Sequence, residues 1–263
     1  MGRPAYALVT GASQGLGKYF ARALAARKQN VVLVARSKDK LVSIAKELSA
    51  SYSILAEPLE FNLASPGAGQ QLAQQLHERK LPIDLLLNNA GFGLRGEFLA
   101  LPLDRQLEMI NLHNAAVVEL TFNLLPPMVE EHHGAIINVS SIAGFQPLPY
   151  AALYSATKSF LTTFSMSLRE EVRRSGITVV TVCPGRLRAD PEEKQSQENR
   201  QKVPGGEQSH EEVVEETLKK LDRGGGLVIP GRVNRLMVAG QRLIPPNAVP
   251  KIVARMSKPN QEA

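Results

Sequence analysis

The chain is poor in cysteine and tryptophan and has no long hydrophobic run. Its 263 residues include one cysteine, Cys183, and no tryptophan. A single thiol excludes an intramolecular disulfide framework and is typical of a reducing compartment. The apolar surroundings of Cys183, ITVVTVCPG, predict a buried and unreactive thiol. Because no stretch approaches the roughly 20 apolar residues of a membrane span, and we expect no signal peptide before YALVTG, we expect a cytoplasmic protein.

The net charge of +6 is unevenly distributed. Residues 219–263 hold nine Lys and Arg against two acidic residues, whereas residues 1–218 hold 22 against 23. A basic excess confined to the tail is unlike the distributed basic surface of a nucleic-acid-binding fold. We therefore expect no nucleic-acid partner.

Short apolar runs alternate with longer amphipathic segments. Strands are expected within residues 6–11, 30–36, 54–63, 83–91, 134–141, 177–185 and 225–231. Helices are expected over residues 17–27, 41–48, 67–79, 104–125 and 152–174. Several strands are apolar on both faces, which is typical of a parallel sheet covered by helices. The pattern predicts an α/β fold of the doubly wound, Rossmann type, with about seven parallel strands and helices on both faces, in a single domain spanning residues 1–263.

A glycine-rich turn, VTGASQGLGKYF, follows the first strand and opens the first helix. Gly11, Gly15 and Gly17 allow a tight turn, and the helix N-terminus offers free N–H groups to a pyrophosphate. Arg36 lies at the end of the second strand. In NAD-binding proteins of this fold type, an acidic residue at this position binds the ribose 2′-hydroxyl of NAD. Arginine instead suits the 2′-phosphate of NADP, with Ser37 beside it. The turn and Arg36 predict NADP(H) as the cofactor.

Tyr154 and Lys158 are four residues apart in YSATK. In a helix this spacing places both side chains on one face. A nearby ammonium would lower the pKa of the phenol below its usual value of roughly 10 and make it a usable general acid or base. Taken alone, the spacing favours a surface tyrosine with a lysine nearby by chance. Only further motifs in the chain can favour a catalytic pair over this interpretation.

Together these motifs resemble the short-chain dehydrogenase/reductase family, in its compact single-domain, NADP-type branch. The matching pieces, in the family's order and spacing, are TGASQGLG, NNAG, Asn111, NVSSIAG, YSATK and PG. The resemblance implies an oxidoreductase that transfers hydride between NADP(H) and a carbonyl or secondary alcohol of a hydrophobic or acyl-type substrate. The alternative is a non-catalytic NADP-binding protein that serves redox sensing or partner binding.

The resemblance also implies a role for each site residue. Tyr154 is the acid or base at the substrate oxygen, and Lys158 lowers its pKa and holds the nicotinamide ribose. Ser141, rather than Ser140, hydrogen-bonds the substrate carbonyl, and Asn111 anchors a water in a proton relay. The implied cofactor-binding residues are Gly11, Ser13, Gln14, Gly15, Leu16, Gly17, Arg36, Ser37, Asn62, Leu63, Asn89, Ala90, Gly91, Tyr154, Lys158, Pro184, Gly185 and Leu187. Asn88 is expected beside the adenosine ribose and as a support of the central sheet.

Two positions depart from the family pattern. Asn62 stands where the family often has an aspartate that contacts the adenine, and its amide oxygen can accept the same hydrogen bond. Ala189 stands where a threonine usually follows the PG motif, so Arg186 and Arg188 either contact the pyrophosphate instead or are solvated. The polar residues 188–212 occupy the substrate-lid position, and we expect a mobile or disordered loop there.

Further expectations concern the substrate and the partners. Phe145, Leu148 and Leu153 suggest an apolar site mouth for a small-molecule carbonyl or alcohol substrate. His113, His132 and His133 lack metal-ligand spacing, so we interpret them as helix-end and loop residues and expect no metal. The family commonly pairs its long helices, which predicts a homodimer or homotetramer through residues 104–125 and 152–174.

Residues 231–263 form a basic amphipathic extension that Pro245, Pro246 and Pro250 divide. Three roles stay open for it: contact with an anionic membrane surface, a subunit interface, or a cap over the substrate cleft.

Overall fold

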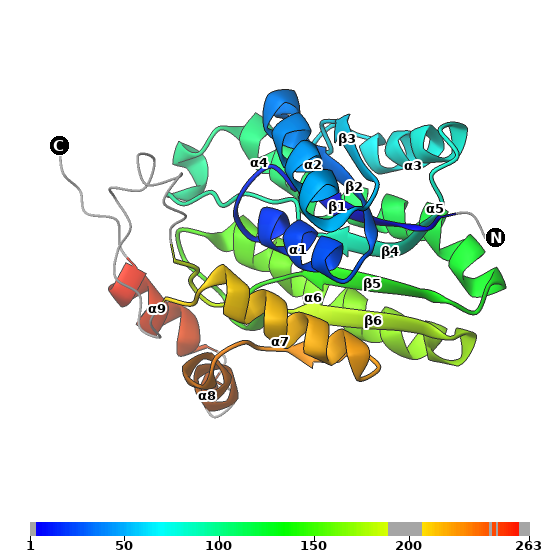
Figure 1. Ribbon diagram of the computed structural model, residues 1–263. Coiled ribbons are helices and arrows are strands. Elements are labelled where there is room, and N and C mark those ends of the chain that lie inside the picture. The colour runs from blue at the N-terminus through cyan, green and yellow to red at the C-terminus, as the bar shows by residue number, and fades with distance from the viewer. Residues whose placement is uncertain (1–3, 189–206, 242–243, 246, 258–263) are drawn as a thin grey trace.

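A computed structural model describes residues 4–188, 207–241, 244–245 and 247–257 (Figure 1). Their strands form one parallel sheet of seven strands in the order β3-β2-β1-β4-β5-β6-β7, which confirms the predicted fold class. The strand order reverses between β1 and β4, and in doubly wound sheets ligands bind beyond the carboxyl ends of the strands at this switch point. The strands are β1 Tyr6–Thr10, β2 Asn30–Ala35, β3 Ala56–Glu60, β4 Ile83–Asn88, β5 Gly134–Val139, β6 Ile177–Val182 and β7 Gly226–Val228.

Helices cover both faces of the sheet, and each face has its own hydrophobic core (Figure 1). Successive side chains of a strand point to opposite faces, so Leu8 of β1 lies in one core and Val9 in the other. Both are fully buried, which explains why the strands are apolar on both faces. The first core contains residues of α1 (Gly15–Ala26), α2 (Lys38–Tyr52) and α7 (His210–Asp222), and the second contains residues of α3 (Ala68–Glu78), α5 (Ala116–Glu130) and α6 (Ala152–Val172).

The helix expected over 104–125 is longer and less regular than predicted. It begins as α4 (Leu103–Ile110), passes through one π-helical turn, η2 (Asn111–Ala115), and continues as α5 to Glu130. The helix continues through Pro126 and Pro127, which have no N–H to donate to the carbonyls of Phe122 and Asn123. These two residues are exposed, so water can hydrogen-bond their carbonyls instead. The π turn falls on Asn111, and such turns are frequent at functional sites.

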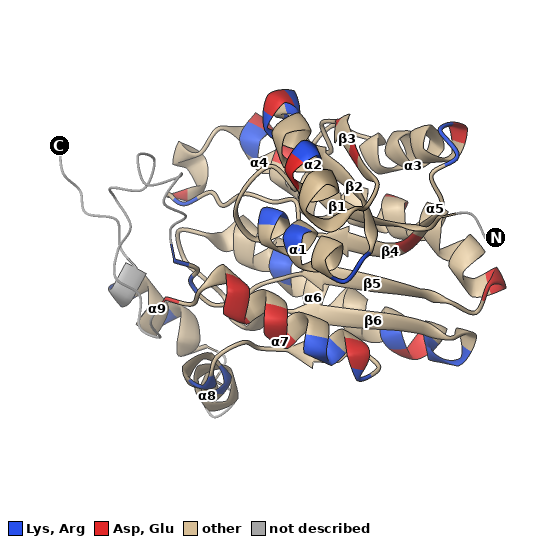
Figure 2. Ribbon diagram, in the orientation of Figure 1, with Lys and Arg blue, Asp and Glu red and all other residues tan. Residues whose placement is uncertain are grey.

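Most of the expected polar loop, including Ala189, lies outside the described residues. Its last residues belong to a helix: the Ser209 side chain accepts from the Glu212 N–H and Glu212 caps the Ser209 N–H in return, so α7 begins at His210 with a complete capping box. The helix has acidic residues in its first turn and basic ones in its last, as its dipole favours (Figure 2). The prediction of a loop up to residue 212 was therefore wrong by one helical turn.

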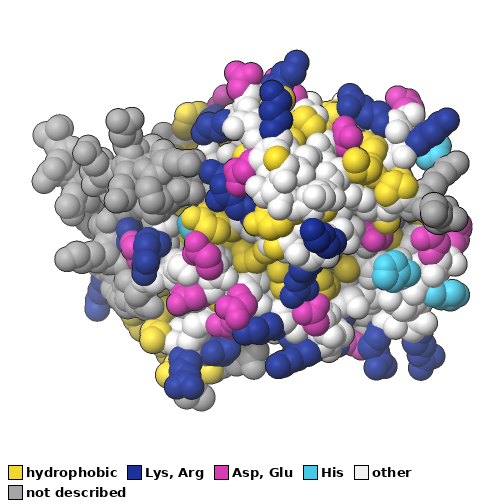
Figure 3. All heavy atoms as spheres, viewed as in Figure 1, with side chains coloured by type: hydrophobic (Ala, Val, Ile, Leu, Met, Phe, Trp, Pro, Cys, Tyr) yellow, Lys and Arg dark blue, Asp and Glu magenta, His cyan; other side chains and the backbone are white. Residues whose placement is uncertain are grey.

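The described part of the C-terminal extension contains two separate helices, α8 (Arg232–Gln241) and α9 (Val249–Ser257). Pro250 does not divide them, because it lies in the first turn of α9, where a helix tolerates proline. Within the described ranges, no helix is both long and apolar enough to cross a bilayer. On the face seen in Figure 3, basic side chains are interspersed with acidic ones.

Candidate active site

The glycine-rich turn is held tightly against the end of β4. Gly11 has a φ of +68°, and a Cβ added to it would lie 2.9 Å from Ala90 Cα. A Cβ on Gly17 would lie 2.3 Å from the Gly11 carbonyl oxygen. The Asn89 side chain donates to the carbonyls of Thr10 and Gly11 at 2.9 and 3.3 Å. Gly17 therefore allows close helix–strand packing, while Asn89 fixes the shape of the turn.

A cleft of about 340 Å³ opens at this turn, at the switch point of the sheet. Helix α1 points its N-terminus into it, with no side-chain cap and no acidic residue in the first turn. Free N–H groups and the positive end of the helix dipole are thus available for a phosphate, and Arg36 lines the same cleft. The predicted residues that line it are Gly11, Ser13, Gln14, Gly15, Leu16, Arg36, Ser37, Asn62, Leu63, Asn89, Ala90 and Gly91. Sequence reasoning missed Val34, Ala35, Phe61, Ala64, Phe92 and Leu112.

Two asparagines expected near the cofactor make hydrogen bonds within the protein. Asn88 is buried and donates to Asn138 at 2.8 Å, and Asn138 in turn donates to Ser165 of α6 at 2.8 Å. Asn88 therefore links strands β4 and β5 and does not line the cleft, contrary to the expectation that it lies beside a ribose. The amide oxygen of Asn62 accepts the N–H of Ala64 at 3.2 Å in a local turn, so one of its two acceptor positions is already taken.

Tyr154, Lys158 and Ser141 meet beyond the carboxyl end of β5. The Lys158 ammonium lies 5.9 Å from the centre of the Tyr154 ring and donates to the Val139 carbonyl at 2.8 Å. Ser141 lies close enough to Tyr154 to lower the pKa of the phenol, and its Oγ atom accepts the N–H of Ala143 at 3.1 Å. The Ser140 hydroxyl turns away and donates to the Lys158 carbonyl at 2.8 Å. One face of α6 and the end of β5 thus bring the three residues together.

The protonation states differ from the expectation. Burial raises the pKa of Tyr154, and the nearby Ser141 side chain only partly opposes this. The net pKa shift is thus opposite to the expected one, because the loss of solvation outweighs the contributions that lower the pKa. Burial also lowers the pKa of Lys158 to about 8. At neutral pH the phenol is therefore protonated and the lysine charged.

His113, interpreted from the sequence as a helix-end or loop residue, lies in the π turn and is buried. Its Nδ1 is 2.9 Å from the Thr157 hydroxyl, which itself donates to the Tyr154 carbonyl at 2.8 Å. Nδ1 therefore donates its proton to Thr157, while Nε2 accepts the N–H of Phe92 at 3.1 Å. Burial and, secondarily, the charge of Lys158 hold the pKa of His113 well below its usual value. In the sequence, the only indication that His113 lies near the site was its position two residues after Asn111. The half-buried Asn111 lies on the same turn.

Pro184, Gly185 and Leu187 lie outside the lining of the cleft. Leu187 packs on the core that contains α1 and α7, and the Pro184 carbonyl accepts the N–H of Ile142 at 3.0 Å. Arg186 forms an ion pair with Glu207 at 3.0 Å. Arg186 is therefore not simply solvated, and its contact with a pyrophosphate stays a prediction.

Cys183 is buried, as predicted, and burial raises the pKa of its thiol to about 11. Among the described residues, no cluster of His, Cys, Asp or Glu could hold a metal ion.

Residues 5–200 match the family model described as short chain dehydrogenase. The chain belongs to this family. It is 38% identical over 183 residues to the very-long-chain 3-oxoacyl-CoA reductase of Homo sapiens, covering 68% of this chain and 58% of that protein. It is 36% identical over 178 residues to the ketoacyl reductase HetN of a Nostoc species, covering 68% and 62%. The chain thus matches less than two thirds of either curated relative.

Among solved structures, a short-chain dehydrogenase from Sphingobium yanoikuyae in complex with NADPH superposes with a TM-score of 0.79 and 29% identity. The alignment covers 98% of each chain. The similarity therefore extends through α7, α8 and most of the tail, beyond the residues that the family model matches.

Proposed function

We propose that the chain is an NADPH-dependent oxidoreductase that reduces the carbonyl of a hydrophobic, acyl-type substrate or oxidises the corresponding alcohol. The observation that carries this proposal is the half-buried Tyr154, which lies beside Lys158 and close to Ser141 at the carboxyl edge of the sheet. A proton donor next to a second hydroxyl is the arrangement that stabilises charge developing on a carbonyl oxygen.

The cofactor is proposed to occupy the cleft at the switch point. The pyrophosphate would lie against the uncapped N-terminus of α1, and Arg36 would bind the 2′-phosphate. The relative in complex with NADPH supports this choice of cofactor. When bound, NADPH supplies the hydride; the chain supplies position and a proton.

Each proposed catalytic residue has a separate task. Tyr154 donates its proton to the substrate oxygen, a task that suits its raised pKa because the phenol is protonated at neutral pH. Ser141 donates a hydrogen bond to the same oxygen. Lys158, charged below a pH of about 8, stabilises the phenolate left behind and holds the ribose. Asn111, on the π turn beside α6, anchors the water that returns a proton.

An acyl-type substrate is supported by the names of the relatives reported above. They are called 3-oxoacyl-CoA reductase and ketoacyl reductase, names that favour an enzyme over a non-catalytic NADP-binding protein.

We also propose a homodimer or homotetramer of a single-domain, cytoplasmic protein. Large apolar side chains are exposed along the two long helices: Leu103 and Leu107 on α4, Phe122 on α5, and Phe160 and Met166 on α6. Phe122 is 77% exposed, and a partner subunit would remove this surface from water.

The test is a panel of 3-oxoacyl thioesters, steroid ketones and small polar aldehydes with NADPH, followed at the absorbance of the cofactor. The wild type should turn over the thioesters or the steroid ketones fastest. Tyr154→Phe should lose at least about 100-fold of the rate while binding NADPH normally. Turnover that survives this substitution would remove Tyr154 from the mechanism.

A further inference from the structure

We infer that a buried pair of amide side chains, Gln208 and Asn234, positions the Pro184–Gly185 turn and, through it, Ser141. This inference rests on the function proposed above. Neither residue belongs to a family motif identified in the sequence. Gln208 precedes α7, whereas Asn234 lies in α8, within the basic extension.

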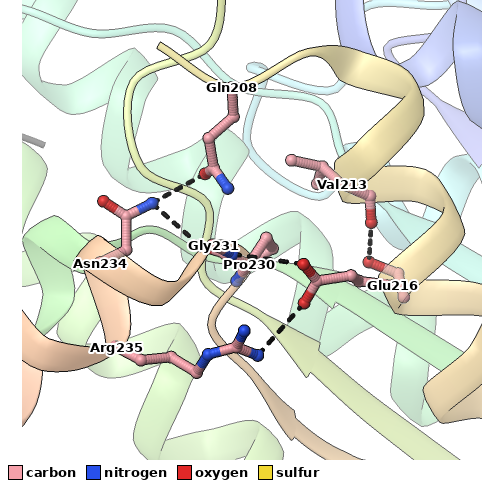
Figure 4. Close-up of polar contacts among 8 residues, drawn as sticks. Gln208, Val213, Glu216, Pro230, Gly231, Asn234 and Arg235 are labelled. Carbon is pink, nitrogen blue, oxygen red and sulfur yellow. Dashed lines mark hydrogen bonds and ion pairs between the residues drawn. The ribbon is translucent and has the colours of Figure 1, made fainter. Parts of the chain in front are cut away.

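The pair is buried and well bonded. Gln208 is 7% exposed and Asn234 is 2% exposed. The Gln208 Oε1 atom accepts from the Gly185 N–H at 3.1 Å and from the Asn234 Nδ2 at 2.8 Å. Asn234 also donates to the Pro230 carbonyl at 2.9 Å (Figure 4). Both lone pairs of one oxygen are therefore used to join α8 to the turn that follows β6.

Backbone bonds hold the same residues in register. Gln208 N–H donates to the Arg186 carbonyl at 2.9 Å, and Arg188 N–H donates to the Gln208 carbonyl at 2.8 Å. A Cβ on Gly185 would lie 2.5 Å from the Asn234 side chain. Glycine at 185 is thus what permits Asn234 to approach so closely.

Helix α8 is itself anchored to α7. Glu216 of α7 accepts the Gly231 N–H at 3.3 Å and forms an ion pair with Arg235 at 3.4 Å (Figure 4). These bonds fix the first turn of α8, on which Asn234 lies. The start of the C-terminal extension therefore packs against the fold close to the proposed site.

The turn in question is bonded to the segment that carries Ser141. The Pro184 carbonyl accepts from Ile142, and the Ser140 N–H donates to the Val182 carbonyl at 2.7 Å. Ser141 lies between these two contacts. A shift of the turn would therefore move the Ser141 hydroxyl relative to Tyr154, and misplacing a catalytic group by about 1 Å can cost roughly 100-fold in rate.

The decisive comparison is between Gln208→Met and Gln208→Glu. Methionine fills a similar volume but offers no comparable acceptor, whereas glutamate keeps an oxygen for both donors. We expect Gln208→Met to lower kcat/KM about 10- to 100-fold and to speed hydrogen exchange at the Gly185 amide. Gln208→Glu should stay within about threefold of the wild type in both measurements. The melting temperatures of the two variants show whether a lower kcat/KM results from a displaced Ser141 or from a less stable protein.

A second comparison tests the route through Ser141. If the pair acts by placing that hydroxyl, Gln208→Met should cost much less in a Ser141→Ala background than in the wild type. A purely structural residue would cost the same in both backgrounds. Hydrogen exchange at the Gly185 amide is the readout that needs no turnover, because this N–H is the group that Gln208 accepts from.

The outcomes are distinguishable. Gln208→Met with unchanged kcat/KM and unchanged exchange at the Gly185 amide, or costs that add fully with Ser141→Ala, would overturn the positioning role. An inert wild type that still binds NADPH would overturn the proposed function instead. In that case hydrogen exchange at the Gly185 amide of Gln208→Met alone decides the inference, and an unchanged exchange rate refutes it.

Discussion

His113 and Thr157 are joined by a hydrogen bond of 2.9 Å in the interior, between the π turn and helix α6. Through its other ring nitrogen His113 also holds the Phe92 N–H at the edge of the proposed cofactor cleft. One neutral imidazole thus ties the wall of the cleft to the helix that carries Tyr154 and Lys158. Four measurements would test this and related features.

The first prediction is that His113 makes the protein sensitive to acid. Its pKa is lowered in the folded state, so as pH falls below about 6.5 the unfolded chain binds a proton that the folded protein does not. Stability is therefore lost on acidification, by up to about 1.4 kcal/mol per pH unit. His113→Gln keeps a donor and an acceptor but cannot titrate. Urea unfolding at pH 7.5 and 5.5 should show a smaller loss for this variant, and equal losses would contradict the assignment.

The second prediction concerns the alkaline limit of activity. Lys158 loses its charge above a pH of about 8, whereas the pKa of Tyr154 is raised above 10 and its phenol titrates later. We expect kcat/KM for NADPH, which reports the free enzyme, to fall above pH 8. Lys158→Met should be slow and flat between pH 7 and about 9.5. If the pH profile of this variant still showed kcat/KM falling with the same midpoint, the titrating group would be a residue other than Lys158.

The third prediction is that Arg36 determines the choice between NADPH and NADH. Arg36→Asp should weaken NADPH binding at least about 10-fold and strengthen NADH binding, because the carboxylate repels a 2′-phosphate and accepts from a 2′-hydroxyl. Fluorescence titrations at two salt concentrations provide the affinities. Lys46→Asp, on an exposed part of α2 outside the cleft lining, makes the same charge change and should leave the ratio unaltered. Similar ratios in the two variants would exclude a specific contact.

The fourth prediction is a stability effect away from the site. The Glu119 carboxylate of α5 accepts the N–H groups of Gly69 and Gln70 at 2.8 and 3.3 Å, so it caps the N-terminus of α3 from another helix. Glu119→Ala should lower the free energy of unfolding by about 1–2 kcal/mol, and Glu119→Gln by less, since it retains an acceptor. Urea denaturation gives both values, and kcat should not change. Equal stability of all three proteins would show that water caps the helix equally well.

The sequence by itself determined the sheet and the place of the cleft. Alternating apolar and amphipathic segments require a parallel sheet with covered faces, because the hydrophobic periodicity is local. The glycine turn, Arg36 and the YSATK segment all follow strand ends or open helices, so the parallel topology brings them to one edge whatever the details of packing.

Only the tertiary structure decided the protonation and the supports of the site. The raised pKa of Tyr154 results from desolvation in the folded protein, which the Tyr–Lys spacing cannot report. His113 contacts Phe92 and Thr157, which are 21 and 44 residues away in the sequence, and Gln208 meets Gly185 and Asn234 across 23 and 26. Desolvation and hydrogen bonds of this kind depend on which surfaces meet after folding, and no local pattern of residues encodes that.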